Sequence, residues 1–176
     1  LLTVGGDGTI PHNVKYAVRY EKPILGVNSG RVGYLAQVEP HEIGCLSRLA
    51  TGEYIIQRRM LLEIQVEGDG ERSLALNDAV FSKGGLARLV DLEILGDGQP
   101  VGSYRADGLI FATPTGSTAY SLSAGGPIVD PGIDTILMTP ICPHSLHARS
   151  VLLSPQVKLE VCGRYADNLD RLVVSV

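Results

Sequence analysis

Apolar residues in the first fifty positions alternate between two spacings. Short apolar runs at residues 1–4 and 23–27 have the character of buried parallel strands. Between these runs, apolar residues recur at helical spacing, and Thr9 is placed to cap that helix. A second helix is expected from Glu39-Pro40 to Thr51-Gly52. The inward positions are predicted to be Ile10, Val14, Ala17 and Val18 in the first helix and Ile43, Leu46, Leu49 and Ala50 in the second. This part therefore predicts an α/β fold with an incomplete Rossmann-like parallel sheet.

From Tyr54 onward the spacing changes to a period of two, which is typical of antiparallel strands. Gly68-Asp69-Gly70 and Gly96-Asp97-Gly98 are predicted turns. The expected strands are 62–66, 73–81, 89–95, 109–112, 135–138, 150–153, 157–161 and 172–176. Many short strands predict a β-rich, sandwich-like domain. We therefore expect domains at 1–52 and 53–176, and, since both ends of the chain lie in strand-like runs, a longer parent protein.

The composition and charge of the chain argue against nucleic-acid-binding and membrane-bound classes of protein. The chain has 176 residues, 44% of them hydrophobic, and a formal net charge of −4 without a basic cluster, which argues against nucleic acid as a partner. It contains no apolar run near 18 residues and no leader-like start, so we expect no membrane association and a cytoplasmic location. The three cysteines are an odd number and are widely spaced, so we do not expect a disulfide framework.

The stretch LLTVGGDGTIP places three glycines around Asp7 between a predicted strand and a predicted helix. Backbone N–H groups and the helix dipole at such a junction favour an anion, most often a phosphate. A carboxylate there repels a phosphate unless it takes a proton or orients a magnesium-bound water. An ordinary Gly-Asp-Gly turn is the alternative. Neither a G-x-G-x-x-G fingerprint, which would need glycine in place of Pro11, nor a P-loop is present.

A second stretch, residues 105–126, interrupts the β pattern with glycines, hydroxyl side chains and Tyr120. We expect a strand ending at Thr113-Pro114 and a short helix capped by Ser117. Small residues admit a flat ligand, hydroxyls offer hydrogen bonds, and tyrosine can stack on a base. A tightly packed buried helix is the alternative. Asn77-Asp78 interrupts a predicted strand, which indicates either a site or a β-bulge.

The segment from Cys142 to His147 holds three potential metal ligands, Cys142, His144 and His147. A zinc site normally needs a further ligand elsewhere in the chain, and no obvious one is present. We therefore expect no protein-bound metal there.

Together these stretches resemble the NAD kinases in their order along nearly the whole chain. The landmarks are Gly5-Gly-Asp-Gly-Thr9, residues 26–35, Asn77-Asp78, Asp107-Gly108, Thr113-Pro-Thr-Gly-Ser-Thr-Ala-Tyr120 and Pro140-Ile-Cys-Pro-His-Ser-Leu146. GGDGT alone is shared with diacylglycerol and sphingosine kinases. The run from Thr113 to Tyr120 together with Asn77-Asp78 is far more specific.

The resemblance implies transfer of the ATP γ-phosphoryl group to the 2′-hydroxyl of the adenosine ribose of NAD, with Mg²⁺, by a homo-oligomer (dimer or tetramer). It makes Asp7 the general base and gives the segment around Cys142 and His144 a structural role. It assigns the triphosphate to Gly5, Gly6, Gly8 and Thr9. It assigns NAD to Asp7, Gly8, Asn77, Asp78, Asp107, Thr118, Ala119, Tyr120 and Ser123. Asp107 is matched to the nicotinamide end, in an arrangement that can cross a subunit boundary.

Two alternatives belong to other classes. A lipid kinase of the diacylglycerol or sphingosine type would share the Asp7 loop, but it would not need the second glycine- and hydroxyl-rich unit, and no membrane-facing stretch is visible. A non-catalytic dinucleotide-binding module would bind NAD without turnover.

Overall fold

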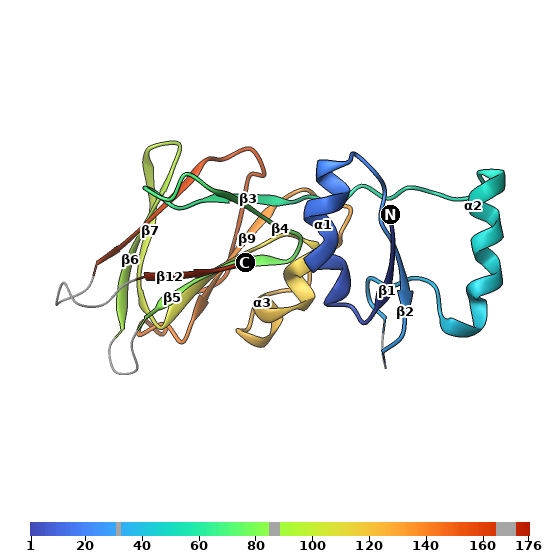
Figure 1. Ribbon diagram of the computed structural model, residues 1–176. Helices are drawn as coiled ribbons and strands as arrows, with labels where there is room; N and C mark the ends of the chain where they lie inside the picture. Colours follow the sequence, from blue (N-terminus) through green and yellow to red (C-terminus); the bar gives the residue numbers. More distant parts are fainter. Residues whose placement is uncertain (31–32, 85–88, 165–171) are drawn as a thin grey trace. The chain divides into compact units, whose positions relative to one another are not determined.

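The computed structural model describes residues 1–30, 33–84, 89–164 and 172–176 (Figure 1). Arg31 and Val32, which belong to the landmark at residues 26–35, lie outside the described residues. The chain divides into two compact units, Leu1–Arg58 and Arg59–Val176. The domain boundary predicted between residues 52 and 53 stays a prediction. Each unit is described by itself.

The first unit is built on a parallel pair of strands joined by a helix. Strand β1 (Leu2–Gly5) pairs with β2 (Leu25–Asn28), with Leu2 opposite Leu25 and Gly5 opposite Asn28. Helix α1 (Thr9–Arg19) connects them and buries Ile10 and Val14. This arrangement confirms the α/β prediction, and it places the loops after β1 and β2 at the same edge of the sheet.

Three expectations about the helices of this unit are wrong. Gly8 is the N-cap residue of α1 and Thr9 is already its first residue, with no side-chain capping bond. The second expected helix is a 3-10 helix, η1 (Pro40–Ser47), followed by one turn of α-helix, α2 (Arg48–Thr51). Its predicted inward residues Ile43 and Leu49 are exposed, as is Val18 in α1, because the elements described do not cover those faces.

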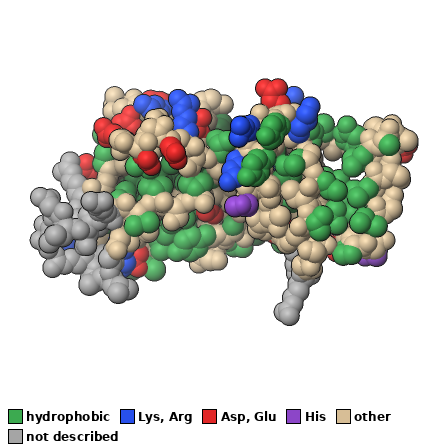
Figure 2. Space-filling model, in the orientation of Figure 1, with side chains coloured by type: hydrophobic (Ala, Val, Ile, Leu, Met, Phe, Trp, Pro, Cys, Tyr) green, Lys and Arg blue, Asp and Glu red, His purple; other side chains and the backbone are tan. Residues whose placement is uncertain are grey.

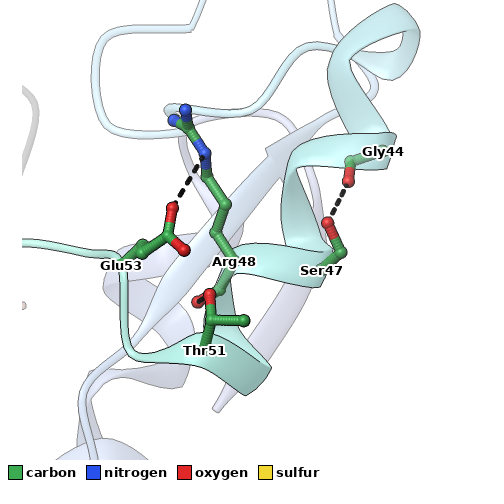
Figure 3. A network of polar contacts seen from close by, with 5 residues as sticks. All are labelled: Gly44, Ser47, Arg48, Thr51 and Glu53. Atoms are coloured by element: carbon green, nitrogen blue, oxygen red, sulfur yellow. Dashed lines mark hydrogen bonds and ion pairs between the residues drawn. The ribbon is translucent and has the colours of Figure 1, made fainter.

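Polar contacts along η1 and α2 involve Gly44, Ser47, Arg48, Thr51 and Glu53 (Figure 3). The Ser47 hydroxyl donates to the Gly44 carbonyl at 2.9 Å and the Thr51 hydroxyl to the Arg48 carbonyl at 3.1 Å. Arg48 and Glu53 form an exposed ion pair at 4.0 Å, a kind of pair that contributes little to stability. Gly52 has a φ of 76°, which is the left-handed conformation that commonly closes a helix.

The second unit consists of antiparallel sheets. A five-stranded sheet has the order β10-β9-β8-β5-β12 and a three-stranded sheet the order β11-β6-β7, while β3 and β4 form a separate pair. The bounds are β3 (Leu62–Gln65), β4 (Arg72–Ala75), β5 (Asp78–Lys83), β6 (Val90–Gly96), β7 (Gln99–Ala106), β8 (Gly108–Ala112), β9 (Ile136–Ile141), β10 (Val151–Leu153), β11 (Leu159–Arg164) and β12 (Leu172–Ser175). The prediction of a β-rich second part is confirmed.

Alternate residues of β8 face two separate cores. Leu109 and Phe111 pack in the core between the five-stranded and three-stranded sheets, together with Leu92 of β6. Ile110 and Ala112 face the opposite side, where they pack with Val129. All four β8 residues are buried, so both faces of this central strand are covered.

Two details of the β-rich part differ from expectation. The strand predicted over 73–81 is two strands, β4 and β5, separated at Leu76 and Asn77. No strand was predicted over Gln99–Ala106, where β7 pairs with β6 through the Asp97-Gly98 turn. Both turn residues have positive φ, 50° and 76°, as a two-residue hairpin turn requires.

The short helix predicted after Thr113-Pro114 is interrupted. A 3-10 turn, η2 (Thr115–Thr118), is followed by one turn of α-helix, α3 (Tyr120–Ser123), with Ala119 between them in a non-helical conformation. Ser117 does not cap a helix. Its hydroxyl donates to the Pro114 carbonyl at 2.7 Å and accepts from the Val129 N–H at 3.0 Å.

Within the described residues, no helix is long and apolar enough to cross a membrane. Several large hydrophobic side chains reach the surface of the first unit, and Figure 2 shows such side chains on the face in view. Val4 of β1 is 65% exposed and Ile55 is 92% exposed.

Candidate functional site

The GGDG loop follows β1 directly and leads into α1. Gly5 is packed against the helix start, since a Cβ there would lie 2.0 Å from the Thr9 hydroxyl oxygen. At Gly6 and Gly8, no atom of the described chain beyond the adjacent residues lies within 4 Å of the position that a Cβ would take. A phosphate can therefore come close to the loop backbone at these two residues.

The Asp7 carboxylate is bound to the backbone of the segment after β2. Its Oδ2 accepts a hydrogen bond from the Tyr34 N–H at 2.7 Å, and its Oδ1 accepts from the Leu35 and Ala36 N–H groups at 3.0 and 3.3 Å. Burial raises the pKa of Asp7, but these three donors outweigh burial and hold the pKa below its usual value. Asp7 is therefore an ionised carboxylate in a fixed orientation.

Asn28, the last residue of β2, forms side-chain hydrogen bonds to the segment that follows β2. It is 2% exposed; its side-chain nitrogen donates to Glu39 at 3.0 Å and its side-chain oxygen accepts from the Gly30 N–H at 2.9 Å. A Cβ at Gly33 would lie 2.6 Å from the Ala36 carbonyl oxygen, so this chain turn needs glycine. Sequence reasoning missed the contact between Asp7 and residues 34–36. The meeting of strand ends at one edge of a parallel sheet was the available signal.

Asn77 lies at the break between β4 and β5 and packs against the Thr113–Gly116 turn. The Thr113 N–H donates to the Asn77 carbonyl at 2.8 Å, and the Thr113 hydroxyl donates to the Leu76 carbonyl at 2.5 Å. A Cβ at Gly116 would lie 2.0 Å from the Asn77 carbonyl oxygen. The two landmarks that sequence reasoning treated separately therefore form one junction, and Asn77-Asp78 is not a β-bulge.

Asp78 opens β5 opposite Ala112 and reaches the start of α3. Burial raises the pKa of its carboxyl, and a hydrogen bond from the Tyr120 backbone N–H opposes that effect in part. Asp78 is thus tied to the backbone of the residue that the sequence suggested as a stacking platform. The Tyr120 side chain itself is 46% exposed.

Residues of the 113–123 stretch divide into two groups by burial. Thr113, Ser117 and Ser121 are fully buried and bonded within the protein; the Ser121 hydroxyl, for example, lies 2.9 Å from that of Thr139. The predicted NAD-binding residues of this stretch are instead at least partly accessible: Thr118, Ala119, Tyr120 and Ser123. The buried group explains why packing and ligand binding were both tenable interpretations of the sequence.

Asp107 does not lie at this junction. It follows β7 at the start of β8, whereas Thr113 follows the end of β8, and β5 runs antiparallel with Ser82 opposite Gly108. The length of β8 therefore separates Asp107 from Asp78 within one chain. The Asp107 carboxylate forms an ion pair with Lys83, the last residue of β5.

Among the described residues, no three His, Cys, Asp or Glu side chains gather in a way that could hold a metal ion. His144 and His147 instead line a cavity of about 330 Å³ together with Tyr104 and Arg105 of β7. Cys142 is exposed and unpaired in the described part of the chain.

Comparison with known proteins gives matches for both units. Residues 1–54 match the model of the ATP-NAD kinase N-terminal domain, and residues 76–174 match that of the ATP-NAD kinase C-terminal domain. The chain is 48% identical to an NAD kinase of Symbiobacterium thermophilum over 92% of its length and 47% identical to one of Gemmatimonas aurantiaca over 100% of its length. The chain spans 58% and 62% of the length of these two relatives, respectively.

Two solved structures of NAD or NADH kinases also match the chain. Yeast NADH kinase complexed with NADH matches with a TM-score of 0.84 and 34% identity, over 99% of this chain and 52% of the yeast chain. An Archaeoglobus fulgidus NAD kinase in complex with ATP matches with a TM-score of 0.80 and 31% identity, over 98% of this chain and 69% of that chain. The GGDG loop, the Asn77–Gly116 junction and these matches together show that the chain belongs to the ATP-NAD kinase family.

Proposed function

We propose that the protein carrying this chain is an NAD kinase, which transfers the γ-phosphoryl group of ATP to the 2′-hydroxyl of the adenosine ribose of NAD. Its relatives at 47–48% identity are NAD kinases, and the solved neighbours are complexes with NADH and with ATP. The structural observation that carries the proposal is the ionised, fixed Asp7 carboxylate in a loop open to phosphate. The product would be NADP.

We assign the phosphates of ATP to the loop made by Gly5, Gly6, Gly8 and Thr9. Open space beside Gly6 and Gly8 supports this assignment, as does the start of an eleven-residue helix at Thr9. Phosphoryl transfer depends mostly on positioning and on neutralising charge, so backbone N–H groups can do much of this work without a P-loop lysine.

Asp7 is proposed as the group that orients the ribose hydroxyl and accepts its proton. A carboxylate has about four lone-pair positions, and the three backbone donors leave one for a substrate hydroxyl. Those donors make Asp7 a weak base. A weak base suffices if the transition state is loose, since the hydroxyl proton then leaves late in the reaction.

Mg²⁺ would come with ATP and would neutralise charge on the transferred phosphoryl group. Carboxylate oxygens are ligands that Mg²⁺ accepts, often through water. The one lone-pair position left on Asp7 is assigned to the ribose hydroxyl, so Mg²⁺ would be held by the phosphates of ATP and by water. The magnesium requirement remains part of the proposal.

We assign NAD to Asn77, Asp78, Asp107, Thr118, Ala119, Tyr120 and Ser123, together with Asp7 and Gly8. The accessibility of residues 118–120 and 123 and the half-buried Asp78 carboxylate support this set. Asp107 lies a strand length from Asp78, so we propose that it serves the site of a neighbouring subunit in a homo-oligomer. Action in the cytoplasm stays a prediction.

A turnover assay tests the proposal. The full-length protein is incubated with NAD, ATP and Mg²⁺, and NADP is followed with an NADP-specific dehydrogenase. Calorimetry with NAD alone sets the lipid kinase apart, because an NAD kinase and a non-catalytic module both bind NAD and a lipid kinase does not. The turnover assay separates the other two, since only the kinase forms NADP. Replacing NAD by NADH in the same assay measures the preference between the two acceptors.

A further inference from the structure

Arg59 borders the junction between Asn77 and the Thr113–Gly116 turn. Its Nη1 lies 3.5 Å from the Thr115 hydroxyl oxygen, and its side chain is half-buried. Thr115 is the first residue of η2 and precedes Gly116, whose backbone packs on the Asn77 carbonyl. A guanidinium group therefore lies at the edge of the surface to which NAD is assigned.

The packing of neighbouring residues limits how far Arg59 can move. Met60 packs against the core between the two large sheets, and Leu62, the first residue of β3, is buried in that core. These contacts anchor the chain directly after Arg59. Arg58, in contrast, is exposed.

The charges of this junction need a cation if an anionic ligand binds there. Asp78 supplies a half-buried carboxylate whose pKa is raised by burial. A dinucleotide brings a diphosphate with two further negative charges. Because a guanidinium carries five N–H donors in a planar fork, it can keep a protein contact while it binds a phosphate oxygen.

We propose that Arg59 binds the diphosphate of the NAD molecule whose adenosine ribose is phosphorylated. This inference rests on the proposed function and adds a residue to its site. It makes Arg59 a determinant of specificity for a dinucleotide over a nucleoside. A merely structural Arg59, which holds the η2 turn through Thr115, is the competing explanation.

Binding of ligands with and without a diphosphate separates the two explanations. NAD and ADP-ribose carry the diphosphate, whereas adenosine does not. Calorimetry measures the affinity for NAD and for ADP-ribose, and saturation-transfer NMR measures the affinity for adenosine. For Arg59→Gln, we expect affinity for NAD and ADP-ribose to fall about tenfold or more and affinity for adenosine to change less than about twofold. Arg59→Lys should recover part of the loss, because it keeps the charge but not the fork.

Arg58→Gln is the matched control, since it removes the neighbouring exposed charge, and it should bind like the wild type. An equal loss of adenosine and ADP-ribose affinity in Arg59→Gln would show a structural role, and unchanged affinity for all three ligands would show no role; either result overturns the proposal. If Arg59→Gln does not fold, as judged by its thermal transition, Arg59→Lys decides by the same comparison of ligands. Failure of the wild type to bind NAD would overturn the proposed function itself.

Discussion

The carboxylate of Asp78 accepts a hydrogen bond from the backbone N–H of Tyr120, which joins the first residue of β5 to the first residue of α3. Burial raises the pKa of Asp78 and this bond offsets burial only in part, so the native state holds the proton more tightly than the unfolded chain. The stability that Asp78 contributes is fully present below its unfolded pKa, near 3.8, and is lost as pH rises through the raised native value.

We therefore expect Asp78→Asn to be at least as stable as the wild type at pH 7. Its amide oxygen can still accept from Tyr120, while the charge that burial penalises is gone. Thermal unfolding between pH 4 and pH 8 should show a flatter pH dependence for the variant. At each pH, the Tm of the wild type is subtracted from that of Asp78→Asn. A smaller difference at pH 7 than at pH 4 would contradict the raised pKa of Asp78.

Gly116 cannot carry a side chain without moving Asn77. A Cβ would lie 2.0 Å from the Asn77 carbonyl oxygen and 2.4 Å from its carbonyl carbon, both of which are backbone atoms. We expect Gly116→Ala to lower the free energy of unfolding by about 2 kcal/mol or more, as measured by denaturant titration. Gly44→Ala is the control, since no atom of the described chain beyond its chain neighbours and its own helix backbone lies within 4 Å of its Cβ position. Equal stability of the two variants would argue against the close packing of the two loops.

Thr113 bridges the same two loops through its hydroxyl, which donates to the Leu76 carbonyl and accepts from the Gly116 N–H at 3.0 Å. Valine has nearly the same shape but leaves both groups buried without a partner. We expect Thr113→Val to lose about 1–3 kcal/mol of unfolding free energy. Thr113→Ser should recover most of this loss. A Thr113→Val protein as stable as wild type would show that the bridge contributes little.

The separation of Asp107 from Asp78 predicts complementation between subunits. If one site uses Asp78 of one subunit and Asp107 of another, a mixed dimer of Asp78→Ala and Asp107→Ala subunits retains one intact site of two. Co-expression of two inactive variants should then restore about a quarter of wild-type turnover, since about half of the dimers are mixed. Absence of any recovery, with mixed oligomers verified by mass spectrometry, would place both residues in the site of one subunit or leave Asp107 outside it.

Asp7 should not cause a pH transition near neutrality. Its three backbone donors hold its pKa below the ordinary value of 3.8, so it stays ionised from about pH 5 upward. The ionisation of Asp7 should therefore leave kcat/KM unchanged from about pH 5 to 8. Activity, and the contribution of Asp7 to stability, should be lost only as pH falls through its lowered pKa. An acid limb near pH 6.5 that disappears in Asp7→Asn would contradict this assignment.

Much of the fold follows from local patterns. The parallel pair β1–β2 and most strands of the second unit were predicted because apolar spacing records which face is buried. The strand β7 was missed because only one of its residues, Ala106, is fully buried, so its pattern carries little apolar signal. The second helix was assigned an inward face that the described chain leaves exposed, since spacing shows amphipathicity but not what covers it.

The candidate site was predictable in its residue types and not in its contacts. GGDGT and the Thr113–Tyr120 run were identified by composition and by resemblance. The bonds from residues 34–36 to Asp7 and from Tyr120 to Asp78 join segments far apart in sequence through backbone N–H groups, which no side-chain pattern reveals. Thr9 and Ser117 were expected to cap helices because both types favour caps, but Gly8 takes the first role and Ser117 bonds to Val129 instead.

The most direct test of the account is NADP formation by the full-length protein with Asp7 replaced. The wild type should convert NAD, ATP and Mg²⁺ to NADP. Asp7→Asn should lower turnover at least about a hundredfold, because it removes the proton acceptor, while calorimetry shows NAD affinity within about threefold of the wild type. Turnover by Asp7→Asn above a tenth of the wild-type value would contradict the claim that this carboxylate takes the ribose proton.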